Sequence, residues 1–216
     1  MSRDNGILIF AGSTREGSLN RALASNAAIA ATELRLGATL LDLREYPLPL
    51  YERDVERTLG MPRNAMSLRA QLKRHATWLI VSPDHHGSTS TLLRNVIDWA
   101  ACHVVGEQLG VCFRQKTIGL LSTLNDDHCG APGLAHLRQI LTHLGASVGS
   151  GEFLIPGHPP AFDSTGNLLD GSRRAALREF VHATHASTRP QPSPATASLA
   201  DSVKNLTSRW SFASPS

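Results

Sequence analysis

A short loop near the N-terminus carries the residue types that bind phosphate. It reads Gly12-Ser-Thr-Arg-Glu-Gly-Ser-Leu-Asn20 and lies between an apolar run and a segment of helical character. A phosphate there would meet the N–H groups and the positive dipole end of a helix that begins near Ser18. Ser13 and Ser18 add hydroxyl donors, and Arg15 adds a guanidinium that can bind two phosphate oxygens. The loop is neither a GxGxxG nor a Walker motif, which argues against a dinucleotide bound in the ordinary way.

Two further polar loops follow later apolar runs. They are Ser82-Pro-Asp-His-His-Gly-Ser88 and Ser122-Thr-Leu-Asn-Asp-Asp-His-Cys-Gly-Ala-Pro-Gly133. No G-x-S-x-G elbow surrounds their serines, so a serine hydrolase is disfavoured. If both loops border one crevice, six side chains that could bind a metal come together there. They are borderline ligands that would suit Zn or Fe: Asp84, His85, His86, Asp127, His128 and Cys129. Their spacing is not diagnostic of a metal site, so we expect polar loops without a metal.

Short apolar runs alternate with longer amphipathic segments and predict the fold that positions these loops. We expect strands at 6–11, 39–43, 78–81, 116–121 and within 147–154, and helices at 18–35, 63–75, 89–103, 134–144 and 171–185. Strands that are apolar throughout, each followed by a helix, imply a parallel sheet covered on both faces. Five such units match a flavodoxin-like α/β three-layer sandwich with strand order 2-1-3-4-5. That order places the ligand crevice at the carboxyl ends of strands 1, 3 and 4.

Composition sets the remaining bounds. The chain has 216 residues, of which 41% are hydrophobic, and this fits one domain over residues 1–185. Residues 186–216 are rich in Ser, Thr, Ala and Pro, and we expect a disordered tail. The net charge of +3 comes from scattered residues, which disfavours nucleic acid as a partner. No run of about 20 apolar residues and no signal-like start occur, so we expect a cytoplasmic protein without a membrane partner.

The first loop resembles the GSxRxxSxNxxLA pattern of the NAD(P)H-dependent FMN reductase family. That family includes flavin, quinone, azo-dye and chromate reductases and ArsH-type proteins. The matching residues are Gly12, Ser13, Arg15, Ser18, Asn20, Leu23 and Ala24, and the resemblance runs from Ile7 to about Leu144. It implies that Ser13, Arg15, Ser18 and Asn20 surround the phosphate of FMN, with the main chain at Leu19 in contact.

The second loop is similar to the family's P-E-Y-N-x-S-x-P-G-x-L-K-N-x-I-D-W segment, but it departs where the flavin ring should lie. The resemblance places Pro83, Asp84, His85, His86, Gly87 and Ser88 along the isoalloxazine. Here Asp84 replaces Glu, His85 replaces Tyr, His86 replaces Asn and Ser90-Thr91 replaces Pro-Gly. An imidazole stacks less extensively than a phenol, so His85 and His86 are candidate tuning residues. We expect Asn95, Asp98 and Trp99 to be structural rather than catalytic.

The third loop supplies the remaining candidates for flavin contact, which are Ser122, Thr123 and Asn125. The resemblance implies an oxidoreductase that passes a hydride from NADPH or NADH through FMN to a small acceptor such as a flavin or a quinone. The two cofactors carry this chemistry, so we expect no catalytic side chain. A second hypothesis is an FMN-binding member with lost or specialised redox activity, used as a sensor or in biosynthesis. A third is the metal site described above.

The resemblance also implies a homodimer or homotetramer with flavin sites near the subunit contacts. The helix expected at 89–103 carries apolar residues that could contribute to such a contact, although core packing is the alternative for part of them: Leu92, Val96, Trp99 and Ala100.

Overall fold

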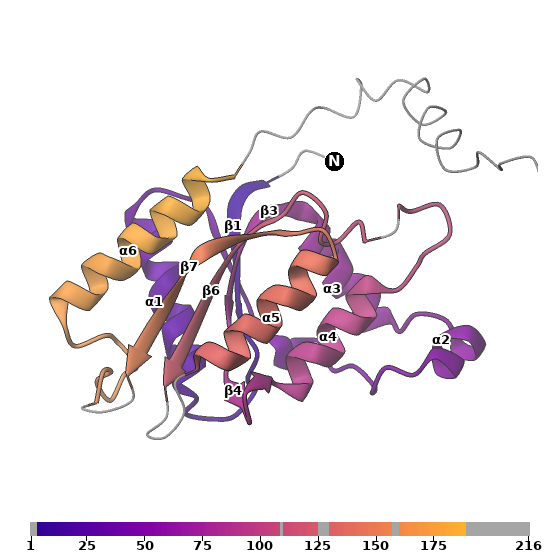
Figure 1. The fold of residues 1–216 in the computed structure, drawn as a ribbon, viewed down its shortest axis with the longest axis horizontal. Coiled ribbons are helices and arrows are strands. Elements are labelled where there is room, and N and C mark those ends of the chain that lie inside the picture. Colours follow the sequence, from indigo (N-terminus) through magenta and orange to yellow (C-terminus); the bar gives the residue numbers. More distant parts are fainter. Residues whose placement is uncertain (1–3, 109, 125–129, 157–159, 189–216) are drawn as a thin grey trace, which may run out of the picture.

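A computed structural model describes residues 4–108, 110–124, 130–156 and 160–188. Its main sheet contains β1 (Asp4–Ala11), β2 (Ala38–Leu41), β3 (His75–Val81), β6 (Thr117–Leu124) and β7 (Ser147–Pro156). All neighbouring pairs are parallel, and the order is β2-β1-β3-β6-β7 (Figure 1). Renumbered by sheet strand, this is the predicted flavodoxin-like order 2-1-3-4-5, and the prediction is confirmed.

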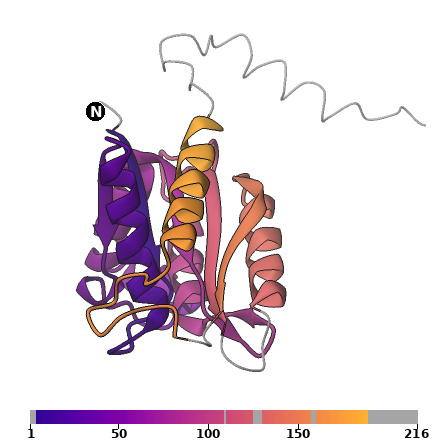
Figure 2. The ribbon, with the colours of Figure 1, turned by 90° about the vertical axis from the view of Figure 1, so that its left-hand side faces the viewer.

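Helices cover both faces of the sheet. α1 (Leu19–Glu33) and α6 (Gly171–Ala186) lie side by side on one face (Figures 1 and 2). The other face carries α3 (Arg63–Arg74), α4 (Thr91–Ala101) and α5 (Ala131–His143). Among the helices of the described residues, none is long and apolar enough to cross a membrane.

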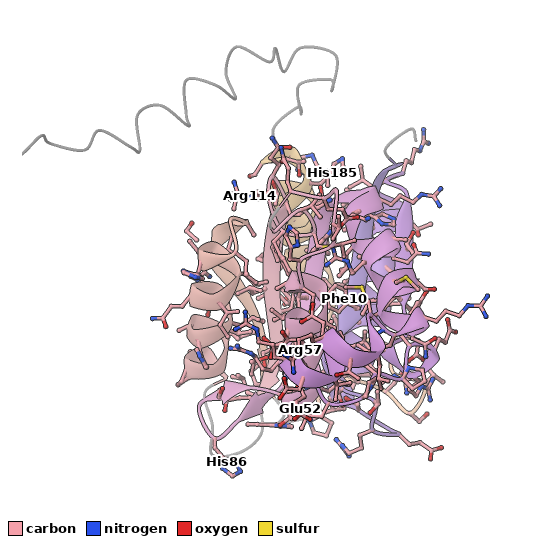
Figure 3. All side chains as sticks on the ribbon, turned by 90° about the vertical axis from the view of Figure 1, so that its right-hand side faces the viewer. Phe10, Glu52, Arg57, His86, Arg114 and His185 are labelled. Carbon is pink, nitrogen blue, oxygen red and sulfur yellow. The ribbon has the colours of Figure 1, made fainter. Side chains whose placement is uncertain are left out.

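The strands are apolar on both faces because each face is buried. In β1, Ile7 and Ile9 pack toward α1 and α6, whereas Leu8 and Phe10 pack toward the helices opposite. Phe10 accordingly lies in the middle of the molecule in Figure 3. This two-sided burial explains why the strands read as continuous apolar runs. Because all the strands are parallel, their carboxyl ends lie at the same edge of the sheet.

Four short elements were not expected from the sequence. A 3-10 turn, η1 (Leu43–Glu45), and a short helix, α2 (Arg53–Leu59), lie between β2 and α3. Also, β4 (Asp84–His85) and β5 (Ser88–Thr89) form an antiparallel hairpin, so α4 begins at Thr91 rather than 89. α2 has no buried residue and the hairpin strands have two residues each, so neither leaves a periodic apolar pattern.

Candidate functional site

A cleft opens at the carboxyl edge of the sheet where the three predicted loops meet. We call it the loop cleft; its volume is about 360 Å³. The residues that line it are Ser13, Arg15, Ser18, Leu19, Asn20, Pro83, Asp84, His85, His86 and Thr123. Each of them is among the candidates that the sequence supplied. Of the other four, Gly87, Ser88 and Ser122 do not line the cleft, and Asn125 lies outside the described residues.

The helix end in this cleft offers unused donors. Ser18 is the N-cap of α1 with extended backbone angles, and its side chain makes no capping hydrogen bond. Ser18 is only 5% exposed, and within the described ranges its hydroxyl makes no hydrogen bond although it lines the cleft. The N–H groups of Leu19 and Asn20, in the first turn, have no acceptor within the helix. A buried hydroxyl beside free helix N–H groups fits an anionic ligand such as a phosphate.

Arg15 supplies the positive charge of the loop cleft. Its side chain is exposed, and the part of the chain that the structure describes contains no ion pair to it. A guanidinium carries five N–H donors in a planar fork, so Arg15 can bind two oxygens of a ligand phosphate. Gly17 precedes Ser18 with φ +65°, the left-handed region that glycine adopts readily, and this turns the loop into α1.

Asn20 has a structural bond that sequence reasoning did not foresee. Its Oδ1 accepts a hydrogen bond of 3.1 Å from the main-chain N–H of Thr123. This bond ties the start of α1 to the end of β6, across 103 positions of sequence. Asn20 therefore fixes the distance between the first and third loops.

The hairpin is held against α5 by two side chains. The Asp84 carboxylate accepts from the Gly87 N–H at 2.7 Å and from the Gly133 N–H at 2.9 Å. The Ser88 Oγ and the His136 Nδ1 are 2.9 Å apart. Ser88 therefore contacts α5 instead of lining the cleft, and Gly87 closes the turn. Both residues thus stabilise the hairpin or its contact with α5.

The tip of the hairpin has left-handed backbone geometry. His86 has φ +56° and Gly87 has φ +78°. Asn, Asp and His adopt this region more readily than other residues with a side chain. The family's Asn at the position of His86 suits the same geometry. Figure 3 shows the His86 ring at the foot of the molecule, directed outward from the hairpin.

The end of β6 is packed more tightly than expected. Ser122 is fully buried, and its Oγ lies 3.4 Å from the Thr123 carbonyl oxygen. A Cβ at Gly130, the N-cap of α5, would lie 2.7 Å from the Leu124 Cδ2. Gly130 also has φ +60°, a left-handed conformation that glycine adopts without strain. The burial of Ser122 makes it a supporting residue behind the cleft.

The side chains of Asn95 and Trp99 on α4 make structural hydrogen bonds, in agreement with the prediction. Asn95 accepts from the Tyr51 N–H at 2.7 Å and donates to the Pro49 carbonyl at 2.9 Å. The Trp99 indole N–H donates to the same carbonyl at 2.8 Å. Val96, Trp99 and Ala100 are buried in the chain's own core, so they are not available to a second subunit. Core packing, the alternative role expected for part of this face, therefore holds for these three, whereas Leu92 is half-buried.

The alternative metal site finds no support in the described ranges, where no three His, Cys, Asp or Glu side chains group to hold an ion. The Asp84 carboxylate already accepts hydrogen bonds from two main-chain N–H groups. Asp127, His128 and Cys129 lie outside the described residues.

A second hollow lies on the other side of the first loop. This side cavity has a volume of about 240 Å³ and shares Ser13 and Ser18 with the loop cleft. Its remaining walls come from α1 and the end of β2: Ala11, Gly17, Arg21, Ala22, Ala24, Ser25, Leu40, Leu41, Asp42 and Leu43. Sequence reasoning missed it, although an acidic residue directly after the second strand was a usable signal.

An ion cluster borders the side cavity. Asp42 accepts from the Arg44 side chain at 2.6 and 2.9 Å, from the Arg44 main-chain N–H at 3.0 Å, and from Arg21 at 3.1 Å. Hydrogen bonds from the Arg44 side chain are the largest cause that holds the pKa of Asp42 below its usual value. Glu16 and Glu45 also interact with Arg44, so nearby carboxylates balance the two arginines and the cluster has no net positive charge.

Comparisons with known proteins agree with this geometry. Residues 6–159 match the family model described as NADPH-dependent FMN reductase. An NAD(P)H-dependent FMN reductase of Pseudomonas aeruginosa is 32% identical over 184 residues, covering 85% of this chain and 95% of that protein. A quinone reductase of Escherichia coli is 29% identical over 155 residues, covering 68% and 75%. The structure of a flavoenzyme NAD(P)H:(acceptor) oxidoreductase from Paracoccus denitrificans superposes with a TM-score of 0.71 at 23% identity, covering 84% and 95%.

Proposed function

The chain belongs to the NADPH-dependent FMN reductase family and is a flavin-dependent NAD(P)H oxidoreductase, and we propose that its loop cleft holds the FMN and serves a small acceptor such as a quinone or a free flavin. The observation that carries this assignment is the donor set around the start of α1. A nearly buried Ser18 hydroxyl, the first-turn N–H groups of α1 and the Arg15 guanidinium, which makes no ion pair within the described residues, all line the cleft. Only an anionic group satisfies all of them together.

When bound, FMN supplies the hydride chemistry, and the protein's task is to position the rings and exclude water. Ser13, Arg15 and Ser18 would hold the phosphate. The wall formed by Pro83, Asp84, His85 and His86 would lie along the flavin ring, with the two imidazoles as tuning residues. The hydrogen bonds that Gly133 N–H donates to Asp84 and Thr123 N–H donates to Asn20 hold the loops of the cleft in place. No side chain of the cleft needs to act as a nucleophile or general base.

The acceptor is proposed from the relatives and from the shape of the site. The relatives named above are an FMN reductase and a quinone reductase. The hairpin that forms one wall of the cleft is exposed at His85 and His86, so one side of a bound flavin ring would be accessible to small planar molecules. NADH and NADPH would reach the ring from the same side, and donor and acceptor would alternate there.

We also propose a homodimer or homotetramer. α2 has no buried residue, and the segment around it exposes Leu50 at 73% and Leu59 at 79%. A seven-residue helix is marginal in isolation, so contact with a second subunit would stabilise it. A groove of about 310 Å³ between α4 and α5 adds partly exposed apolar surface from Ala101, Ile140 and Leu144.

The spectrum of the purified protein tests the proposed function. A protein that contains oxidised flavin has absorption bands at about 375 and 450 nm. Anaerobic NADPH or NADH should bleach the 450 nm band, and addition of a quinone should restore it. A protein that stays colourless after incubation with FMN contradicts the proposal. A yellow protein that neither donor reduces favours the sensor hypothesis instead.

A further inference from the structure

The groove between α4 and α5 exposes apolar side chains that the proposed flavin chemistry does not use. Its volume is about 310 Å³, and Ala101, Ile140 and Leu144 are each partly exposed along it. A helix that covered this surface with apolar side chains of its own would remove both from water. We propose that residues 199–210 of the same chain bind this groove as an amphipathic helix.

The sequence of this segment, which lies outside the described part of the chain, has a helical period. Its large apolar residues are spaced by four, three and four positions: Leu199, Val203, Leu206 and Trp210. At about 100° per residue they fall within an arc of about 60°. Asp201 and Lys204 fall on the opposite side. A single apolar stripe of this kind is what a helix presents to a groove.

The residues before the stripe supply a start for this helix. Ser198 stands three positions before Asp201, which is the Ser-x-x-Asp pattern of a capping box ahead of an apolar run. The composition of the tail predicts disorder as a whole, but residues 195–210 contain neither Pro nor Gly. A helix of this length is marginal in isolation, so it requires a surface that covers its stripe.

The linker is long enough to reach the groove from the end of α6. The Thr188 Oγ1 lies 2.6 Å from the Thr77 Oγ1, near the amino end of β3. Because β6 separates β3 from β7, Ser147 at the start of β7 lies two strand spacings of about 4.8 Å from Thr77. Leu144 is three residues before Ser147, which puts this end of the groove within about 25 Å of Thr188. A proline-rich linker extends by about 3.1 Å per residue, so residues 189–198 span about 30 Å.

The end of α6 and one end of the groove lie at the same edge of the molecule. Figure 3 shows His185, in the last turn of α6, and Arg114 together at the top. The Arg114 side chain adjoins the end of α5, since a Cβ at Gly145 would lie 3.1 Å from its Cγ. A chain that leaves α6 can therefore cross the amino edge of the sheet and enter the groove at Leu144.

The opposite end of the groove suits the aromatic residue of the segment. A helix that enters with Leu199 at Leu144 and runs antiparallel to α5 carries Trp210 about 16 Å further, to the end formed by Arg94 and His136. The side chain of Arg94 is 51% exposed, and an indole ring stacks well on a guanidinium. A segment bound here makes the groove part of the subunit itself and leaves the exposed segment at α2 as the proposed subunit contact.

Cross-linking of the full chain tests whether the segment lies in the groove. One variant carries Gln139→Cys, in the groove, together with Ser202→Cys, beside the apolar stripe. Its control carries Glu179→Cys, on the exposed side of α6, in place of the groove cysteine. A free tail would reach Glu179 at least as easily, because α6 leads directly into the tail. Both proteins also carry Cys129→Ser, and the two remaining native cysteines are buried.

We expect a short bismaleimide to join the Gln139→Cys pair within one chain about tenfold faster than the Glu179→Cys pair, because docking raises the effective concentration. Val203→Glu should remove this preference, since it places a charge in an apolar groove. Asn205→Glu adds the same charge on the outer side of the helix and should retain the preference.

Equal rates for the two cysteine pairs, or a preference that survives Val203→Glu, would overturn the proposal. A product that joins two chains would overturn it as well, because the tail of a second copy would then occupy the groove. Since no flavin takes part in the cross-linking, its result does not depend on the proposed function.

Discussion

The Gly133 N–H donates a hydrogen bond of 2.9 Å to the Asp84 Oδ2, joining the hairpin to the first turn of α5. The approach is so close that a Cβ at Gly133 would lie 2.8 Å from that oxygen and 2.9 Å from the Ser88 carbonyl oxygen. Asp84 stands where the related family has a longer Glu. A short carboxylate and a residue without a side chain thus fit together, and this contact sets the position of the wall along which the flavin ring would lie.

The first prediction tests that fit. Gly133→Ala should lower the free energy of unfolding by about 1–3 kcal/mol, because the added methyl must displace Asp84 or the hairpin backbone. The affinity for FMN should fall with it. Gly151→Ala is the control, since a Cβ there meets nothing within 4 Å, and it should change stability by less than about 0.5 kcal/mol. Urea unfolding and flavin titration measure both effects. Equal stability of the two variants would contradict the account of the contact.

The second prediction concerns the hairpin tip. His86 has φ +56°, a region that Asn adopts easily and β-branched residues avoid. His86→Asn should therefore keep or slightly raise stability, and His86→Val should lower it by about 1–2 kcal/mol. Chemical unfolding of the two variants beside the wild type distinguishes them. A His86→Val protein as stable as His86→Asn would show that the turn relaxes to another conformation.

The sequence predicted the framework because the framework depends on local patterns. Buried strands such as 78–81 are apolar throughout, and loops of Gly, Ser and Arg follow them, so the strand order and most residues of the loop cleft could be read directly. The contact of Asp84 with Gly133 spans 49 positions and depends on how closely α5 approaches the hairpin. No local pattern records that distance. The same reason explains why Ser88 and Ser122 were assigned to flavin contact although one bonds to α5 and the other is buried.

Sequence reasoning missed α2 and the side cavity, because neither produces a periodic pattern of apolar residues. α2 buries nothing, so it has no apolar stripe. The side cavity depends on Arg21, Asp42 and Arg44 meeting across α1 and β2. The role of Asn125, the cytoplasmic location and the disordered tail from 186 stay predictions, and residues 189–216 lie outside the described part of the chain.

The third prediction uses pH. Glu107 accepts hydrogen bonds from Lys73 and from the nearly buried Arg69. The bond from Lys73 is the largest cause that lowers the pKa of Glu107 from its usual value of 4.5, and the bond from Arg69 lowers it further. A lowered folded-state pKa means that the stabilisation is present above about pH 4.5 and is lost as the pH falls through the folded-state value. Glu107→Gln should therefore cost about 1–2 kcal/mol at pH 7 and progressively less below pH 4.5.

Glu179→Gln, on the exposed side of α6, is the control for this measurement. Its difference from the wild type should stay small at every pH. Urea unfolding at several pH values between about 3 and 7 gives both curves. A Glu107→Gln deficit that does not shrink in acid would show that the cluster stabilises the fold through packing rather than through charge.

The fourth prediction concerns assembly. One chain has a mass of 23.2 kDa, and we expect light scattering at micromolar concentration to give about two or four times that value. Leu59→Glu should shift the mass toward that of a single chain if the exposed segment at α2 forms the contact, because it would bury an unpaired charge there. A wild-type mass near 23.2 kDa would contradict the proposed oligomer.

The most direct test of the central claim is a comparison of FMN and riboflavin, which differ only in the phosphate. The wild-type apoprotein should bind FMN far more tightly than riboflavin when either is followed by quenching of flavin fluorescence. Arg15→Ala should reduce that advantage about 10- to 100-fold, because it removes one charge-assisted phosphate contact worth about 1.5–3 kcal/mol. Its affinity for riboflavin should stay unchanged. Equal affinities of the wild type for the two flavins, or a full FMN advantage in Arg15→Ala, would contradict the assignment of this loop to the flavin phosphate.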